Sequence, residues 1–306
     1  MGEMTGMGDK TVLVTGATGT VSTALLGALQ GTPGLKLRAL VRDPAGTKAQ
    51  ALQKDGVEIV AGDLEEPDTL AEAFDGVDIL WLLTPASALE PSMGSNAVTS
   101  ARRAKVGHIV RNSAIKAGHD APNRNGRLHA LVEESVKASG IPWTILRPHY
   151  YMQNLLSSAA SVASDGMLYM NMGQGRVGMI DGRDVGVFAA KVIQNAERHA
   201  GKTYTPTGPE LTTMAEAAET LSNVLGKRVN YVALPPEAAQ QAMLGFGLSR
   251  WFVGNVVDYG RVYAEGWGDF TTSDFKEVTG HEARSFKQFA TDFAPTFGGS
   301  PVPAHA

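Results

Sequence analysis

The feature that most constrains the fold is a glycine turn that follows directly on a short apolar run near the start of the chain. Residues 11–15 are apolar or β-branched and read as a strand, and Ser22–Leu29 carries small and apolar residues at helical spacing. The turn between them reads Thr15-Gly16-Ala17-Thr18-Gly19-Thr20-Val21-Ser22. Glycines at such a turn bring the backbone N–H groups of a helix N-terminus close to a ligand, and a pyrophosphate is the ligand that suits them.

The turn is therefore predicted to bind a dinucleotide. The third glycine of the usual fingerprint is replaced by Ser22, which is still small enough for close packing of helix on strand. The alternative is a glycine turn that binds nothing, and the strand–turn–helix context argues against it. The candidate cofactor-binding residues of the turn are Gly16, Thr18, Gly19, Thr20 and Val21.

Alternation of strands and helices continues to about residue 146 and predicts an α/β fold. Strands are expected at 35–41, 57–60, 77–83, 108–112 and 143–146, and helices at 47–55, 67–74, 92–105 and 128–139. Strands joined through helices form a parallel sheet that is covered on both faces. We expect a Rossmann-type doubly wound parallel sheet with a smaller C-terminal α/β substrate lobe.

The regular alternation of strands and helices ends at about residue 150. We assign residues 1–155 to the NAD(P)-binding domain and 156–306 to a smaller substrate lobe packed on it, with 143–205 contributing some strands to the sheet. A helix is predicted over 214–225, because Thr213 and Glu216 form a capping box and Gly226 suits a left-handed C-terminal cap. Further helices are expected from residue 237 and over 285–293, the last with Phe286, Phe289 and Phe293 at helical spacing.

The residue at the end of the second expected strand indicates which dinucleotide the chain binds. NAD-binding proteins place Asp or Glu about 20 residues after the glycine turn, whereas a 2′-phosphate calls for Arg. The sequence has Arg42 at this point, and a guanidinium donates bidentately to a phosphate. We predict NADP(H), with Lys48 as a second cation. The alternative is that Arg42 forms an exposed ion pair with Asp43.

Composition narrows the function classes. The 306 residues include no Cys, and 27 Lys plus Arg against 31 Asp plus Glu give a net charge of −4. Disulfides, thiolate metal sites and cysteine nucleophiles are thereby excluded. The chain has no excess of basic residues that would attract nucleic acid or an anionic membrane. No apolar run is long enough to span a bilayer. The seven His show no metal-ligand spacing, so no metal is predicted. We expect a cytoplasmic protein whose partner is a small-molecule substrate, not nucleic acid or a membrane; self-association into a homodimer is left open.

With these motifs in place, the chain resembles the NmrA-like, atypical branch of the short-chain dehydrogenase/reductase superfamily from residue 11 to about 297. The motifs that carry the resemblance are Thr15-Gly-Ala-Thr-Gly19, Val41-Arg42, Gly62-Asp63-Leu64, Thr84-Pro85, Ile145-Leu-Arg-Pro148 with His149-Tyr150-Tyr151 and Asn154, Ile180-Asp181-Gly-Arg-Asp184-Val185, Gly201-Lys-Thr-Tyr204 and Gly208-Pro209.

The resemblance implies a binding role for residues at several strand ends. Asp63 and Leu64 would flank the adenine, Thr84 and Pro85 would line the nicotinamide ribose, and residues 148–151, beginning with Pro148, would lie near the nicotinamide. Asp63 follows a strand, so its carboxylate can accept from the adenine amino group. Capping of the following helix is an equal alternative for Asp63.

The catalytic residues depart from the superfamily pattern, which is a Ser after the fifth strand and a Tyr-x-x-x-Lys pair. Ser113 follows the fifth strand, but alignment on the helix that ends at Gly140 puts Asn125 in the Tyr position and His129 in the Lys position. The usual proton donor is absent. An imidazole can bond a ribose hydroxyl or donate a proton near neutral pH, so His129 is the candidate acid, with a purely structural histidine as the alternative. Tyr150 and Tyr151 are the other conceivable acids, and one of them is expected in the core.

A dense group of aromatic residues marks the expected substrate side. Seven of the 21 aromatics lie between residues 246 and 270: Phe246, Trp251, Phe252, Tyr259, Tyr263, Trp267 and Phe270. Such clusters form walls for flat apolar ligands, but they also form lobe cores and subunit interfaces.

We therefore expect an NADPH-dependent oxidoreductase that transfers hydride to a flat, aromatic, quinone- or imine-like small molecule without the Tyr-x-x-x-Lys pair. Such an electrophile demands less of an enzymatic acid than a ketone does, which fits the missing Tyr. The alternative is an NADP(H)-sensing regulatory protein without turnover, and a non-redox reaction in the same fold is a third reading.

Overall fold

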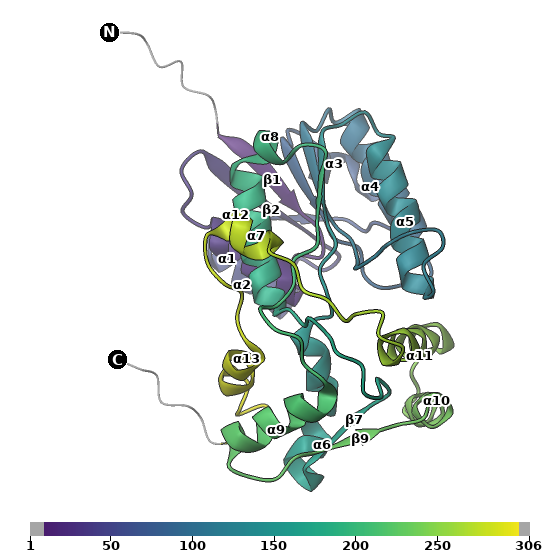
Figure 1. Ribbon diagram of the computed structural model, residues 1–306. Helices are drawn as coiled ribbons and strands as arrows, with labels where there is room; N and C mark the ends of the chain where they lie inside the picture. Colours follow the sequence, from purple (N-terminus) through teal and green to yellow (C-terminus); the bar gives the residue numbers. More distant parts are fainter. Residues whose placement is uncertain (1–8, 300–306) are drawn as a thin grey trace. The chain divides into compact units, whose positions relative to one another are not determined.

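The computed structural model describes residues 9–299, which form two compact units built from interleaved stretches of chain (Figure 1). The first unit comprises residues 9–113, Leu128–Leu146 and Gly186–Tyr204. The second comprises Ala114–Arg127, Arg147–Val185 and residues 205–299.

The first unit is a seven-stranded parallel sheet in the order β3-β2-β1-β4-β5-β6-β8. Its strands are β1 (Lys10–Val14), β2 (Leu35–Val41), β3 (Glu58–Ala61), β4 (Ile79–Leu82), β5 (His108–Asn112), β6 (Trp143–Leu146) and β8 (Lys202–Tyr204). The strand order reverses at β1 and β4, as in a doubly wound sheet. The predicted α/β fold class is confirmed.

Helices cover both faces of this sheet. Alternate side chains of the central strands, such as Leu13, Leu80 and Ile109, pack with α3, α4 and α5 into one apolar cluster. Trp81 points the other way, and its indole N–H donates to Ser22 of α1 at 3.0 Å. The helices associated with the sheet are α1 (Thr20–Leu29), α2 (Thr47–Lys54), η1 (Pro67–Thr69), α3 (Ala71–Phe74), α4 (Glu90–Arg103), α5 (Arg124–Lys137), α7 (Gly182–Gln194) and α8 (Ala196–His199).

Several helix boundaries differ from the prediction. The stretch predicted as one helix over 67–74 divides into η1 and α3. Helix α4 starts two residues before the predicted Ser92, because Pro91 suits the first turn of a helix, where its missing N–H costs nothing. Helix α5 starts at Arg124, four residues before the predicted start, and so carries both Asn125 and His129.

The second unit contains a two-stranded parallel sheet, β7 (Met167–Met170) with β9 (Asn230–Ala233), and an apolar cluster of its own. Helix α9 (Met214–Leu225) has the predicted capping box at Thr213 and the left-handed cap at Gly226. Phe286 and Phe289 are buried in the cluster and Phe293 packs against it. The remaining helices are η2 (Met152–Ser158), α6 (Ala159–Asp165), α10 (Pro236–Gly245), α11 (Arg250–Ala264), α12 (Asp274–Thr279) and α13 (Phe286–Asp292). Among residues 9–299, no helix has the length and apolar character needed to cross a membrane.

Candidate functional site

The turn between β1 and α1 has the backbone that the sequence predicted. Gly16 adopts φ +59°, a left-handed conformation that favours glycine. Gly19 is the N-cap of α1, and no side chain caps the first-turn N–H groups. Acidic residues are also absent from that turn. The helix N-terminus therefore keeps its donors and its partial positive charge for an anionic ligand, which fits a pyrophosphate.

Two hydroxyl side chains hold this turn in place. The Thr15 hydroxyl donates to the carbonyl of Leu83 at 2.8 Å and accepts from the Leu83 N–H at 2.8 Å, which ties the ends of β1 and β4 together. Ser22, which stands where the fingerprint has a third glycine, donates to the Thr15 carbonyl at 3.1 Å. Ser22 thus adds a hydrogen bond that a glycine could not make, so the departure from the glycine pattern preserves the turn.

Most of the predicted cofactor residues lie at one edge of the sheet, because the carboxyl ends of parallel strands meet there. Gly16 follows β1, Arg42 follows β2, Asp63 follows β3 and Thr84 follows β4. The point between β1 and β4, where strand order reverses, is where ligands bind in open α/β sheets. Thr20 and Pro85 are exposed, whereas Val21 and Leu64 are buried.

Arg42 is exposed, and within residues 9–299 it forms no ion pair. The carboxylate of Asp43 is turned to its own loop, where it accepts from the Ala45 N–H at 2.9 Å. The alternative of an Arg42–Asp43 pair therefore finds no support in the geometry. Lys48 Nζ lies 3.5 Å from the Thr18 carbonyl, beside the glycine turn.

Asp63 has a local role in addition to any ligand. Its Oδ1 accepts from the Glu65 N–H at 3.0 Å, and Thr69 Oγ1 accepts from the Asp63 N–H at 2.9 Å. These bonds organise the turn that leads into η1, as the capping alternative anticipated. The Leu64 carbonyl accepts from Asn96 of α4 at 2.8 Å, which fixes the same loop.

A buried charged cluster beside the sheet edge was missed at the sequence level. Glu90, the first residue of α4, and Arg111 of β5 both have fully buried side chains, and Arg111 Nη2 donates to Glu90 Oε1 at 2.5 Å. Thr84 donates to the same oxygen at 3.1 Å and accepts from Arg111 Nη1 at 2.9 Å. His129 Nδ1 lies 2.9 Å from both Glu90 Oε1 and Arg111 Nη2. An arginine inside a predicted central strand was the available signal, because charged residues are seldom buried unless paired.

The cluster connects the predicted acid with a predicted ribose ligand. Burial by itself would raise the pKa of Glu90, but the charge and hydrogen bond of His129, helped by Arg111 and Thr84, lower that pKa below its ordinary value. Glu90 is therefore a carboxylate at neutral pH. Its second oxygen, Oε2, is buried and has no hydrogen-bond partner within residues 9–299.

Ser113 is buried at the end of β5, and its hydroxyl is engaged. It donates to Glu133 Oε1 at 2.7 Å, and the other oxygen of Glu133 lies 3.2 Å from Lys137 Nζ. Glu133 and His129 are one turn apart on α5. The Ser113 proton is thus held by a buried carboxylate, an arrangement that the spacing of the sequence did not reveal.

Tyr150 and Pro148 belong to the second unit. Tyr150 packs edge-to-face on Tyr263 with ring centroids 5.4 Å apart, and burial raises its pKa above the ordinary value. Its backbone N–H donates to His149 Nδ1 at 2.8 Å, so the His149 proton is on Nε2 and donates to the Gly268 carbonyl. Burial lowers the pKa of His149 to about 3, which makes it a neutral structural anchor.

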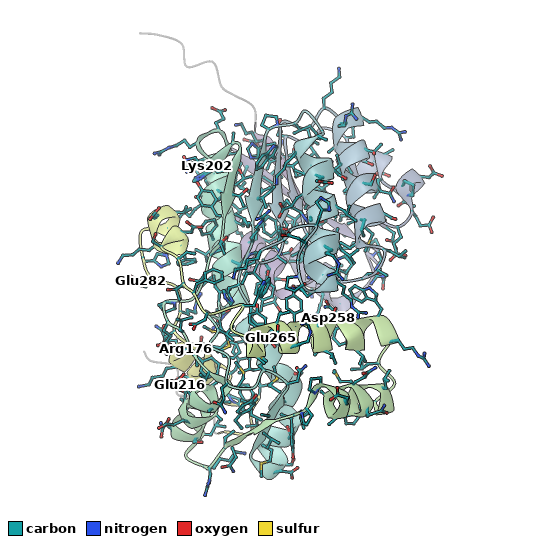
Figure 2. All side chains as sticks on the ribbon, turned by 45° about the vertical axis from the view of Figure 1, so that its right-hand side comes forward. Arg176, Lys202, Glu216, Asp258, Glu265 and Glu282 are labelled. Carbon is teal, nitrogen blue, oxygen red and sulfur yellow. The ribbon has the colours of Figure 1, made fainter. Side chains whose placement is uncertain are left out.

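The first turn of α5 is anchored in the second unit. Asn125 is buried and donates to the Tyr259 hydroxyl at 2.9 Å. Arg124 Nε donates to Asp258 of α11 at 2.8 Å, and Figure 2 labels Asp258 on that helix. Asn125 therefore has a defined hydrogen bond in place of the superfamily's Tyr, but an amide is not a proton donor for catalysis.

The aromatic residues of 246–270 do not share one environment. Tyr263 is fully buried, and Tyr259 and Trp267 pack against the same cluster, so these three are core residues of the second unit. Phe246, just after α10, is 84% exposed, and Phe252 of α11 is 40% exposed. The core alternative thus fits part of the group, and the substrate wall stays a prediction for the rest.

The doubly wound sheet, the glycine turn and the free arginine at the end of β2 define a dinucleotide-binding protein of Rossmann type. The NmrA-like family model matches residues 8–266. The chain belongs to the NmrA-like family, and the resemblance inferred from its motifs is confirmed.

Several relatives are informative. The chain is 36% identical to an NAD(P)H azoreductase of Xenophilus azovorans over 292 residues, which cover 94% of this chain and all of that protein. An NADPH-dependent quinone oxidoreductase of Escherichia coli, solved with NADPH, is 26% identical with a TM-score of 0.83 over 92% of this chain and 99% of that one. A triphenylmethane reductase of Citrobacter sp., solved with NADP(H), is 25% identical with a TM-score of 0.81 over 93% and 99%.

Proposed function

We propose that this chain is an NADPH-dependent oxidoreductase that reduces flat, conjugated electrophiles such as quinones, azo compounds and cationic aromatic dyes. The observation that carries the proposal is the sheet edge on which the uncapped glycine turn and the unpaired Arg42 lie on adjacent strands. The names of the similar proteins, an azoreductase, a quinone oxidoreductase and a triphenylmethane reductase, support the same substrate class.

The chain's own residues have distinct roles in binding the cofactor. The N–H groups of the β1–α1 turn bind the pyrophosphate, Arg42 binds the 2′-phosphate, and Asp63 and Leu64 flank the adenine. Thr84 and Pro85 line the nicotinamide ribose. NADPH, when bound, supplies a hydride, which is two electrons and one hydrogen nucleus.

The missing Tyr-x-x-x-Lys pair shapes the choice of substrate. A cationic dye needs only the hydride, whereas a quinone or an azo group also needs a proton on oxygen or nitrogen. His129 is the residue proposed to deliver that proton, because an imidazole can exchange one near neutral pH. Orientation of the electrophile against the nicotinamide supplies much of the remaining acceleration.

The test is NADPH oxidation by the purified protein with a panel of acceptors: a 1,4-quinone, an azo dye, a cationic triarylmethane dye and a simple ketone. Turnover of the conjugated acceptors and none of the ketone is expected. Calorimetry with NADP⁺ and NADPH runs beside it. Binding of both forms without turnover of any acceptor would replace the proposal with the regulatory alternative.

The cellular setting belongs to the same proposal. A cytoplasmic location supplies NADPH and a small-molecule substrate, and the net charge of −4 argues against nucleic acid as a partner. Measurement of the molar mass in solution shows whether the chain forms a homodimer.

A further inference from the structure

The hydrogen bonds of the buried cluster converge on one atom. Glu90 Oε1 is surrounded by three polar atoms: Arg111 Nη2 at 2.5 Å, His129 Nδ1 at 2.9 Å and Thr84 Oγ1 at 3.1 Å. Arg111 is itself oriented by the Leu82 carbonyl at 3.2 Å and by Thr84. The carboxylate oxygen that faces His129 is therefore fixed by groups from the sheet and from α4.

His129 Nδ1 lies between a group that can only donate and a group that can only accept. With a proton on Nδ1, the ring donates to Glu90 Oε1; with a lone pair there, the ring accepts from Arg111 Nη2. The two arrangements put the other ring nitrogen, Nε2, in opposite states when the ring is neutral. The neighbour that Nδ1 selects thus decides whether a neutral His129 carries a proton or a lone pair at Nε2.

The second ring nitrogen is available. Within residues 9–299, Nε2 of His129 has no hydrogen-bond partner, and 10% of the side chain is exposed. The charged groups that face the ring are Glu90 from α4 and Arg111 from β5. On its own helix, Glu133 is engaged by Ser113 and Lys137.

We infer that Glu90 is a positioning residue that holds a proton on Nδ1 of His129, so that Nε2 is the atom through which His129 exchanges a proton with the substrate. The inference deepens the proposed function and rests on it. Arg111 and Thr84 keep the Glu90 carboxylate aimed at the ring, as a buried carboxylate orients the histidine of a hydrolase triad.

With a quinone as substrate, the quinone gains a hydride from NADPH and is reduced, and NADP⁺ is left as the oxidised product. The Nε2–H bond of the imidazolium breaks, its electron pair stays on Nε2, and the proton forms an O–H bond on the substrate. The neutral ring that remains keeps its proton on Nδ1, where it donates to Glu90 Oε1, and a proton from water then restores the Nε2–H bond.

Nuclear magnetic resonance of the full-length protein with isotopically labelled histidine tests the tautomer without any variant. Proton-bearing and lone-pair-bearing ring nitrogens give separate signals, and a His129→Asn sample assigns those of His129. We expect the neutral wild-type ring to carry its proton on Nδ1. In Glu90→Gln, a neutral amide competes less well with Arg111, so the proton is expected on Nε2. A wild-type proton on Nε2 overturns the inference, whether or not the variant folds.

Kinetics with two acceptors separate a positioning role from a general structural one. In Glu90→Gln, kcat for a quinone is expected to fall about tenfold or more, because proton delivery is lost. The kcat for a cationic triarylmethane dye, which takes hydride alone, should change less than about twofold, with KM for NADPH unchanged. Glu72→Gln, the same change on the exposed face of α3, is the matched control and should affect neither acceptor.

Equal losses with both acceptors, or no loss with either, overturn the inference. Failure of the proposed function looks different, because wild-type protein would then reduce neither acceptor while the tautomer measurement could still succeed. A rise in KM for NADPH with an unchanged quinone kcat would assign His129 to the ribose instead, and would also overturn it.

Discussion

Arg111 shows how one charged side chain can belong in the middle of a buried strand. Removing a guanidinium from water is costly, and its partner carboxylate must be close and well oriented to compensate. Here Glu90 contacts it at 2.5 Å, and Thr84 and the Leu82 carbonyl accept further hydrogen bonds from it. Removal of one member of such a buried pair typically costs about 3–5 kcal/mol, whereas an apolar pair would fold as well. The free-energy cost of burying Glu90 and Arg111 has a functional reason if the pair positions His129.

Replacement of Arg42 tests the choice of cofactor. Arg42→Ala should raise KM for NADPH about 10- to 100-fold, since a hydrogen bond to a charged group contributes about 1.5–3 kcal/mol. KM for NADH, which has no 2′-phosphate, should change little. Steady-state kinetics with both coenzymes measure the ratio.

The matched control is Lys36→Ala, which removes an exposed cation from the opposite end of the same strand, where it pairs with Asp9 at 3.7 Å. It should leave both coenzymes unaffected. If Arg42→Ala weakened NADH as much as NADPH, the phosphate assignment would be wrong.

Among the helices and strands, the sequence predicted best where the physics is local. Three strands, β2, β5 and β6, have the predicted bounds, because each contains several aliphatic residues and lies between turns. Helix α9 was likewise bounded by its own caps. The start of α4 was missed because Glu90-Pro91 was not recognised as a first turn, and with it the acidic half of the buried cluster.

The β1–α1 segment permits a test in which one change has opposite effects at two positions. Gly16→Ala forces a side chain into φ +59°, and the left-handed region costs about 1–2 kcal/mol for a residue with a Cβ. We expect that loss in the free energy of unfolding, measured in urea, together with weaker NADPH binding.

Gly27→Ala is the control on the same helix. Gly27 is helical and exposed, and a Cβ there would have nothing within 4 Å. Alanine in a helix interior is favoured over glycine by about 0.5–1 kcal/mol, so this variant should be more stable and bind NADPH unchanged. Equal effects of the two substitutions would show that the turn does not depend on the left-handed residue.

Across the full chain, the sequence could not predict which distant segments meet. Arg124 donates to Asp258, which is 134 residues further along the chain. Lys116 donates to the carbonyl of Trp267, which is 151 residues further along. Helical and strand periodicity describes neighbours in sequence, so neither pair had a local signal. The same holds for Glu90 and His129, which come from separate helices and meet only because β4 and β5 are adjacent.

Interleaving of the chain predicts that the sheet cannot fold from the first half alone. Gly186 of α7 lies so close to α1 that an added Cβ would be 2.6 Å from the Leu25 backbone nitrogen, and β8 pairs with the edge of β6. A fragment of residues 1–155 lacks both, which leaves one face of α1 and the edge of β6 uncovered.

We expect that fragment to show helical circular dichroism without a cooperative urea transition. Joining residues 182–204 to it through a flexible Gly/Ser linker restores α7 and β8, and should sharpen the transition, since the slope in urea scales with the surface buried on folding. A cooperative transition in the short fragment itself would mean that the first six strands suffice. In that case β8 would be an addition to a sheet that is already stable, and residues 182–204 would not be needed for the first unit to fold.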